Sequence, residues 1–127
     1  MFGEDQRDFL LDHSQSPFHR GQCPGSTHRS RLANPACGDE VELTLRIEGD
    51  RICAAWFTGR GCVVSQAAAS ILAEAIEGLT TSEASSIDEE RMLALFRVPL
   101  TTGRRTCCLL ALWTLHSALG EKACLSD

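Results

Sequence analysis

The sequence lacks the features that direct a protein to a membrane or to nucleic acid. No apolar run reaches the roughly 18 residues that suggest a membrane-spanning helix. The first six residues are acidic and do not follow the basic-then-apolar order of a signal peptide. Positive charge is also scarce: 12 Lys and Arg face 17 Asp and Glu, for a net charge of −5. Because a general nucleic-acid binder is normally basic, we expect a cytoplasmic protein that binds neither nucleic acid nor membrane.

Internal repeats, low-complexity tracts and linkers are absent as well. The 127 residues, of which 43% are hydrophobic and 23% charged, supply enough apolar side chains for one core. We therefore predict a single domain over residues 1–127. The tight C-x-x-C pairs of a zinc ribbon are missing, yet the chain has seven cysteines. In a reducing compartment, this odd and high count indicates metal-binding or redox-active thiols rather than a disulfide framework.

The hydrophobic pattern predicts strands followed by helices. Alternation over residues 41–47 predicts a strand, and residues 51–58 are expected to return antiparallel to it. The returning strand has apolar residues of both parities, which indicates two covered faces or a β-bulge. An edge strand is expected over residues 27–32. Helices are expected over residues 4–13, from 62 or 63 to 77, and over 104–119, with capping boxes at Thr80 and Ser86 starting two short helices in between. This order favours an α+β fold.

Cysteines and one carboxylate lie at the ends of these predicted elements. Cys37 and Asp39 share a turn in which Gly38 permits a positive φ. Cys62 precedes a helix, whose N-terminus favours a thiolate. Cys107 and Cys108 follow two arginines in the first turn of the last helix, so we expect lowered thiol pKa values.

Each of these thiols taken alone also fits a core or loop residue, and we assign Cys53, in mid-strand, to the core. Their shared position at element ends favours a metal site, since thiolates and a carboxylate suit Zn²⁺. Adjacent helical residues point about 100° apart, so one of Cys107 and Cys108 is expected to face Cys37 and Cys62.

Four motifs resemble those of the U-type iron–sulfur cluster assembly scaffolds, the family of IscU, SufU and the N-terminal domain of NifU. Residues 34–39 match N-P-x-C-G-D, residues 57–62 match F-x-G-x-G-C, and residues 105–108 with the later Trp113 are similar to R-x-K-C. Asp12-His13 with Pro17 and Gly21 is similar to D-H-x-x-x-P-x-x-x-G. The resemblance implies a three-stranded antiparallel sheet packed against helices. It also implies Cys37, Asp39, Cys62 and Cys108 as the ligands of Zn²⁺ or a [2Fe–2S] cluster, with Cys107 as a candidate substitute.

The resemblance further implies a non-catalytic scaffold. Such a protein receives sulfur from a cysteine desulfurase, assembles a cluster on three Cys and one Asp, and passes it to apo iron–sulfur proteins or carriers. Cys37, Cys62 and Cys108 are then the candidate persulfide acceptors. The alternative is an enzyme, a zinc-dependent sulfurtransferase of the SufU type. A more distant alternative is a protein-interaction domain held together by structural zinc.

Overall fold

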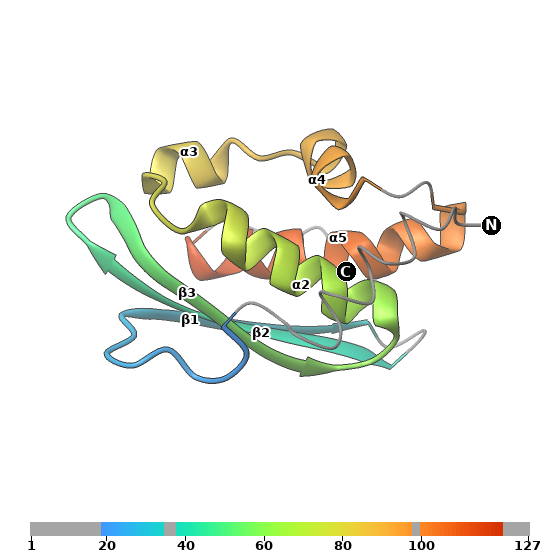
Figure 1. Ribbon diagram of the computed structural model, residues 1–127, viewed down its shortest axis with the longest axis horizontal. Helices are drawn as coiled ribbons and strands as arrows, with labels where there is room; N and C mark the ends of the chain where they lie inside the picture. Colours follow the sequence, from blue (N-terminus) through green and yellow to red (C-terminus); the bar gives the residue numbers. More distant parts are fainter. Residues whose placement is uncertain (1–18, 35–37, 98–99, 121–127) are drawn as a thin grey trace.

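Three antiparallel strands and four helices make up the part of the chain that the computed structural model describes, residues 19–34, 38–97 and 100–120 (Figure 1). The strands β1 (His28–Asn34), β2 (Asp39–Glu48) and β3 (Arg51–Arg60) form one sheet in the order β1-β2-β3. The helices are α2 (Val63–Ile76), α3 (Thr81–Ser85), α4 (Glu89–Phe96) and α5 (Thr102–Ala118). The predicted α+β fold with a three-stranded antiparallel sheet is confirmed. The helix predicted over residues 4–13 lies outside the described residues.

The core lies between the sheet and the helices α2 and α5, which cover the same face of it (Figure 1). Val41, Leu43 and Leu45 of β2 are fully buried, as their alternation with polar residues requires. Helix α2 contributes fully buried alanines, whose small side chains let it approach the sheet and α5 closely. This packing fixes the two helix starts beside one end of the sheet.

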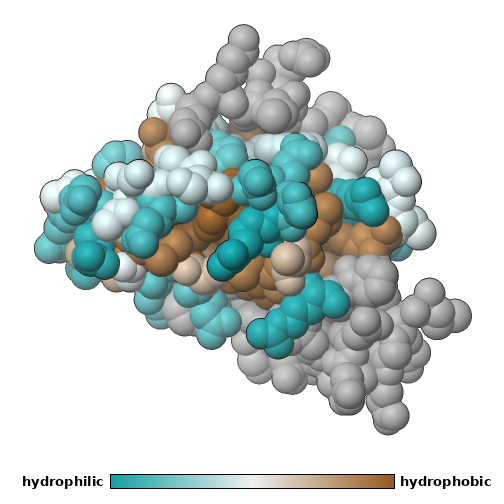
Figure 2. All heavy atoms as spheres, turned by 90° about the horizontal axis from the view of Figure 1, so that it is seen from above, coloured by the Kyte–Doolittle hydropathy of each residue, from teal (hydrophilic) through white to brown (hydrophobic). Residues whose placement is uncertain are grey.

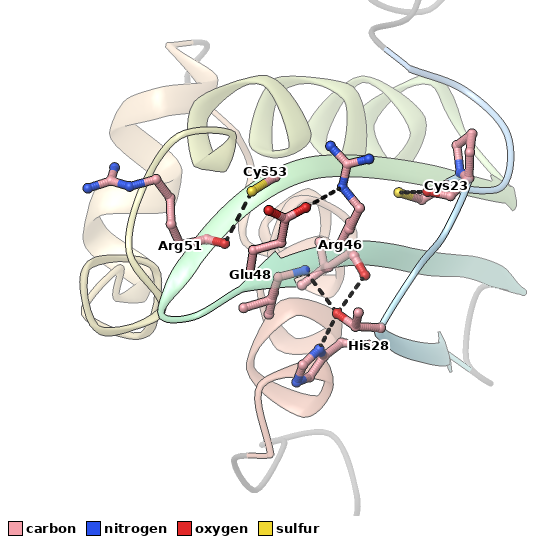
Figure 3. Close-up of polar contacts among 10 residues, drawn as sticks. Cys23, His28, Arg46, Glu48, Arg51 and Cys53 are labelled. Atoms are coloured by element: carbon pink, nitrogen blue, oxygen red, sulfur yellow. Dashed lines mark hydrogen bonds and ion pairs between the residues drawn. The ribbon is translucent and has the colours of Figure 1, made fainter.

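A β-bulge explains why β3 has apolar residues at both odd and even positions. Arg46 pairs with Ala54 and the next residue of β2, Ile47, pairs with Ile52, so that Cys53 has no partner across the strands. Burial accordingly shifts from Ile52 to Ala55 within β3. The prediction that Cys53 belongs to the core is wrong, because the bulge turns this residue partly outward. Its thiol donates a hydrogen bond to the carbonyl of Arg51, over 3.8 Å (Figure 3).

One of the two predicted capping boxes is present. The Thr80 hydroxyl accepts a hydrogen bond from the Glu83 amide at 3.1 Å, and the Glu83 carboxylate accepts one from the Thr80 amide at 2.9 Å. The predicted box at Ser86 is wrong, because Asp88 caps α4 by accepting from the Arg91 amide at 2.8 Å. A carboxylate at this position also complements the helix dipole, which a serine hydroxyl does not.

We expect Asp88→Ala to lower the free energy of unfolding by about 0.5–2 kcal/mol, the usual effect of losing an N-cap. Ser86→Ala is the matched control and is expected to change it by less than about 0.5 kcal/mol. Urea unfolding measured by circular dichroism compares the two. A larger loss for Ser86→Ala would mean that the serine, rather than the aspartate, starts the helix.

The helical side of the molecule has a hollow of about 450 Å³ between α2 and α4. Ile71, Ala75 and Leu95 line it together with Arg91 and Arg97. Figure 2 views the molecule from this side and shows hydrophobic side chains between hydrophilic ones.

Within the described ranges, no helix has both the length and the apolar character needed to cross a membrane.

Candidate metal site

The first side chain of the site is fixed by the connection between β1 and β2. Asn34 and Asp39 are paired across the two strands, and the Gly38 amide donates a hydrogen bond to the Asn34 carbonyl at 2.8 Å. Gly38 has a φ of +77°, which a glycine adopts without strain. This tight connection places Asp39 at the very end of the sheet, where it is 2% exposed.

The second side chain lies where β3 passes into α2. Cys62 is the N-cap residue of α2 and is half-buried. Its amide donates a hydrogen bond to Oδ1 of Asp39 at 3.0 Å, and its thiol donates to Oδ2 at 3.7 Å. The backbone therefore holds one carboxylate oxygen while the other faces the sulfur, an arrangement that orients Asp39 as a ligand.

Gly61 permits this close approach of chain and carboxylate. Its φ is +140°, a conformation that L side chains rarely adopt. A β-carbon at this position would collide with Oδ1 of Asp39 and would lie 2.9 Å from Oγ of Ser65. The second glycine of F-x-G-x-G-C is thus required by the packing of Asp39 against the turn.

Helix α5 brings the third side chain, Cys107. Potential ligand atoms of Asp39, Cys62 and Cys107 all lie within 4.8 Å of one another. The three residues line a hollow of about 460 Å³ whose other described walls are Gly61, Thr101, Gly103 and Arg104. Three segments far apart in sequence therefore converge on one point, as the sequence predicts.

The donor set and its spacing fit a metal centre. Ligands of a tetrahedral Zn²⁺ lie about 2.0–2.3 Å from the ion, which puts them roughly 3.3–3.8 Å from each other. The separation of 3.7 Å between Sγ of Cys62 and Oδ2 of Asp39 agrees with this spacing. Thiolates also bind iron–sulfur clusters, so the chemistry suits either species.

Cys108, the third ligand in the family register, is not part of this group. It is fully buried in the core, and burial raises the pKa of its thiol to about 12. Because successive helical residues point about 100° apart, α5 can direct only one of the pair to the hollow. The structure therefore favours the substitute, Cys107, as the thiol beside Asp39 and Cys62.

The expected lowering of the Cys107 pKa is wrong. Burial raises the pKa of this thiol, and its hydrogen bond with Asp39 and the neighbouring Cys62 raise it further. Helix α5 begins at Thr102, so Cys107 lies in the second turn, farther from the positive end of the helix dipole than predicted. A metal ion bound here must displace a thiol proton, and binding is therefore accompanied by proton release.

Apart from Cys53, which is described above, three cysteines remain. Cys37 and Cys124 lie outside the described residues. Cys23 is buried away from the group, and its thiol donates to the Pro24 carbonyl at 3.6 Å (Figure 3). Of the two arginines that precede the thiols in sequence, Arg104 lines the hollow. It lies three residues before Cys107, which puts both on one helix face.

The chain is similar in sequence and in fold to known proteins. The family model described as the NifU-like N terminal domain matches residues 5–122. The chain is 38% identical over 78 residues to the iron–sulfur cluster assembly scaffold protein IscU of Streptococcus pyogenes serotype M1, an alignment covering 61% of this chain and 48% of that protein. It is 35% identical over 83 residues to the zinc-dependent sulfurtransferase SufU of Bacillus subtilis, covering 65% and 56%. The chain thus spans about half the length of these curated relatives.

A solved structure shares the fold over nearly the whole chain. It belongs to a candidate iron–sulfur cluster assembly scaffold protein for the SUF system from Fervidobacterium islandicum AW-1. The TM-score is 0.73 at 31% identity, and the match covers 88% of this chain and 94% of the other. The arrangement of sheet and helices is therefore shared with this solved structure.

Proposed function

Because the chain belongs to the family of the NifU-like N-terminal domain, we propose that it is an iron–sulfur cluster assembly scaffold. The observation that supports this most is the convergence of Asp39, Cys62 and Cys107 within 4.8 Å. Cys37 is the proposed fourth ligand, since two peptide units keep its Cα within about 7.6 Å of that of Asp39. Cys108 is the alternative to Cys107, as the family register implies. A single domain over residues 1–127 and a cytoplasmic location stay predictions.

In this proposal the cluster is cargo, and the protein supplies ligands that bind it without holding it permanently. A cysteine desulfurase delivers sulfur as a persulfide. A thiolate of the scaffold attacks the outer sulfur, the sulfur–sulfur bond breaks, and the donor cysteine leaves as a thiolate. Cys62 and Cys107 line the hollow and are the favoured acceptors, with Cys37 as a third candidate. The one oxygen ligand binds soft metals less strongly than a fourth sulfur would, which assists transfer to apo iron–sulfur proteins or carriers.

A zinc-dependent sulfurtransferase is the second candidate function. The relative from Bacillus subtilis carries that name, and two thiols beside a carboxylate suit zinc equally well. Zinc at this site would lower the pKa of its ligand thiols and so make them better sulfur acceptors at neutral pH. A protein-interaction domain held by structural zinc is the third candidate.

Anaerobic reconstitution distinguishes these functions. The purified chain is incubated with ferrous iron, cysteine and a cysteine desulfurase, and zinc content and visible absorbance are then measured. The scaffold is expected to develop cluster absorbance and to pass the cluster to an apo-ferredoxin. The sulfurtransferase is expected to retain one zinc ion, to accelerate the desulfurase and to form no visible cluster. Cys62→Ser is expected to abolish either activity in a folded protein, whereas unfolding of this variant would indicate structural zinc.

A further inference from the structure

Three residues run along the free edge of β3, the strand that leads to Cys62. His19, Arg20 and Gly21 lie parallel to it, and the chain then loops round to β1 (Figure 1). The Phe57 amide donates a hydrogen bond to the His19 carbonyl at 3.1 Å, and the Gly21 amide donates to the Phe57 carbonyl at 2.7 Å. We refer to these three residues as the strap. Near Phe57, β3 is thus paired with β2 on one side and with the strap on the other.

Trp56 anchors the strap on the face of the sheet that the helices do not cover. It points to this face because its neighbour Phe57 is buried in the core on the other one. The His19 ring stacks on the Trp56 ring, with centroids 4.5 Å apart and an angle of 9° between the planes. Gly21 has a φ of +139°, and a β-carbon there would lie 3.5 Å from the same ring. The final glycine of the motif that starts at Asp12 thus lets the chain turn close to Trp56.

A carboxylate ties the strap to helix α2. Glu77 is the C-cap residue of this helix, and its Oε2 lies 2.8 Å from Nδ1 of His19. The same oxygen accepts a hydrogen bond from the Ala55 amide of β3 at 3.1 Å. The strap therefore cannot leave the edge of β3 without breaking both the hydrogen bonds at Phe57 and the contact with Glu77.

Arg20 contacts the last part of β3, directly before the turn into α2. Its Nη2 donates a hydrogen bond to the Gly59 carbonyl at 3.2 Å, and its guanidinium lies over the Phe57 ring, 5.9 Å from the centroid. On the other side of the strand, a β-carbon on Gly59 would collide with the carbonyl oxygen of Glu40. Gly59 is therefore held between Arg20 and β2. Glu40 follows Asp39, so this close packing lies one residue from the carboxylate of the candidate site.

From these contacts we propose that Arg20 is a positioning residue for the metal site, which holds the end of β3 in register with β2 and so keeps Cys62 beside Asp39. The inference rests on the proposed function, because it concerns the proposed ligands. Arg20 touches neither of them and acts through Gly59, which precedes Cys62 by three residues. The Cys62 amide reaches Oδ1 of Asp39, at 3.0 Å, only while the ends of the two strands stay in register. Loss of the donor at Gly59 is therefore expected to loosen the contact between Cys62 and Asp39.

Arg20→Met and Arg20→Lys test this proposal as a matched pair. Methionine keeps an apolar stem without a donor, whereas lysine keeps a charged donor for the Gly59 carbonyl. We expect Arg20→Met to weaken zinc binding about tenfold, the lower end of the effect of losing a residue that supports a metal ligand. Arg20→Lys is expected to bind zinc nearly as the wild type does. Competition with a chromophoric chelator measures the affinities.

Arg29→Met is the control for loss of an exposed arginine. Arg29 belongs to β1, at the opposite edge of the sheet, and its side chain is 67% exposed. We expect zinc binding of this variant to change less than about twofold, since sites far apart act independently. An equal loss of affinity in Arg29→Met and Arg20→Met would assign the effect to net charge and overturn the positioning role.

Hydrogen exchange of single amides in the metal-free protein gives a second readout. The Cys62 amide is protected by its hydrogen bond to Asp39, and the Leu43 amide belongs to the middle of β2. We expect Arg20→Met to speed exchange at Cys62 about tenfold and to leave exchange at Leu43 unchanged, because only the strand ends open. Loss of a purely structural strap would instead lower the urea midpoint and speed exchange at both amides.

These measurements separate the inference from the proposed function. Weaker zinc binding and faster exchange at Cys62 in Arg20→Met, with both restored in Arg20→Lys, support the positioning role. Unchanged zinc binding and unchanged exchange at Cys62 overturn it and leave the scaffold function intact, as does equal acceleration at Cys62 and Leu43. A wild-type chain that binds neither zinc nor a cluster overturns both.

Discussion

Replacing Cys107 by serine is expected to weaken zinc binding by more than roughly 100-fold. Loss of a residue that only hydrogen-bonds a metal ligand lowers the affinity by up to about 100-fold, and here a proposed ligand itself is removed. The reason is geometric: Cys107 supplies the sulfur that meets Asp39 and Cys62, and a hydroxyl is a poor ligand for zinc. Competition with a chromophoric chelator measures the affinity. The same variant is expected to unfold at nearly the wild-type urea concentration.

Cys108→Ser is the matched control and should behave in the opposite way. It places a hydroxyl in the fully buried core, which is expected to lower the free energy of unfolding by about 1–3 kcal/mol. Zinc affinity of the folded variant is expected to stay near that of the wild type. If Cys108→Ser loses zinc while Cys107→Ser retains it, the family register rather than the observed geometry identifies the third ligand.

Gly61→Ala is expected to disrupt the site and to lower the free energy of unfolding by about 2–5 kcal/mol. Two effects add here: a φ of +140° that an L residue adopts with strain, and a collision of the new β-carbon with Asp39. Because Asp39 must move away, its oxygen no longer lies near the sulfur of Cys62. Urea unfolding and zinc content of the purified variant measure the two consequences.

Gly49→Ala separates backbone strain from the collision. Gly49 also has a positive φ, of +64°, yet a β-carbon there would meet no atom within 4 Å. We expect this variant to lose about 1–2 kcal/mol and to keep its zinc. Equal effects of the two substitutions would show that the contact with Asp39 contributes nothing to the site.

The strands were predictable because their signal is local. Apolar and polar residues alternate over residues 41–47 because one face of β2 packs against the helices. The apolar residues Val41, Leu43 and Leu45 are accordingly buried. The bulge at Cys53 was predicted as one of two alternatives, since apolar residues of both parities leave the choice to packing. Ser86 and Asp88 are both good caps in sequence, so the selection between them also depends on where α4 packs.

The site was predictable as a set of segments and less so as individual side chains. Turns rich in glycine and helix starts identify Asp39 and Cys62 directly. The choice between Cys107 and Cys108 depends on the rotation of α5 about its axis, which its contacts with α2 and the sheet determine. No local sequence pattern predicts that rotation. Which of the two preceding arginines reaches the hollow depends on the same rotation, and it is Arg104, on the helix face that it shares with Cys107.

The two oxygens of Asp39 have different hydrogen-bond partners, and this affects how the carboxylate is held between successive binding events. Oδ1 is tied to the amide of Cys62, while Oδ2 points toward the thiol. In the proposed metal site, this amide keeps the side chain of Asp39 in place whether or not an ion is bound. The carboxylate is then already oriented for each new ion that the proposed scaffold binds.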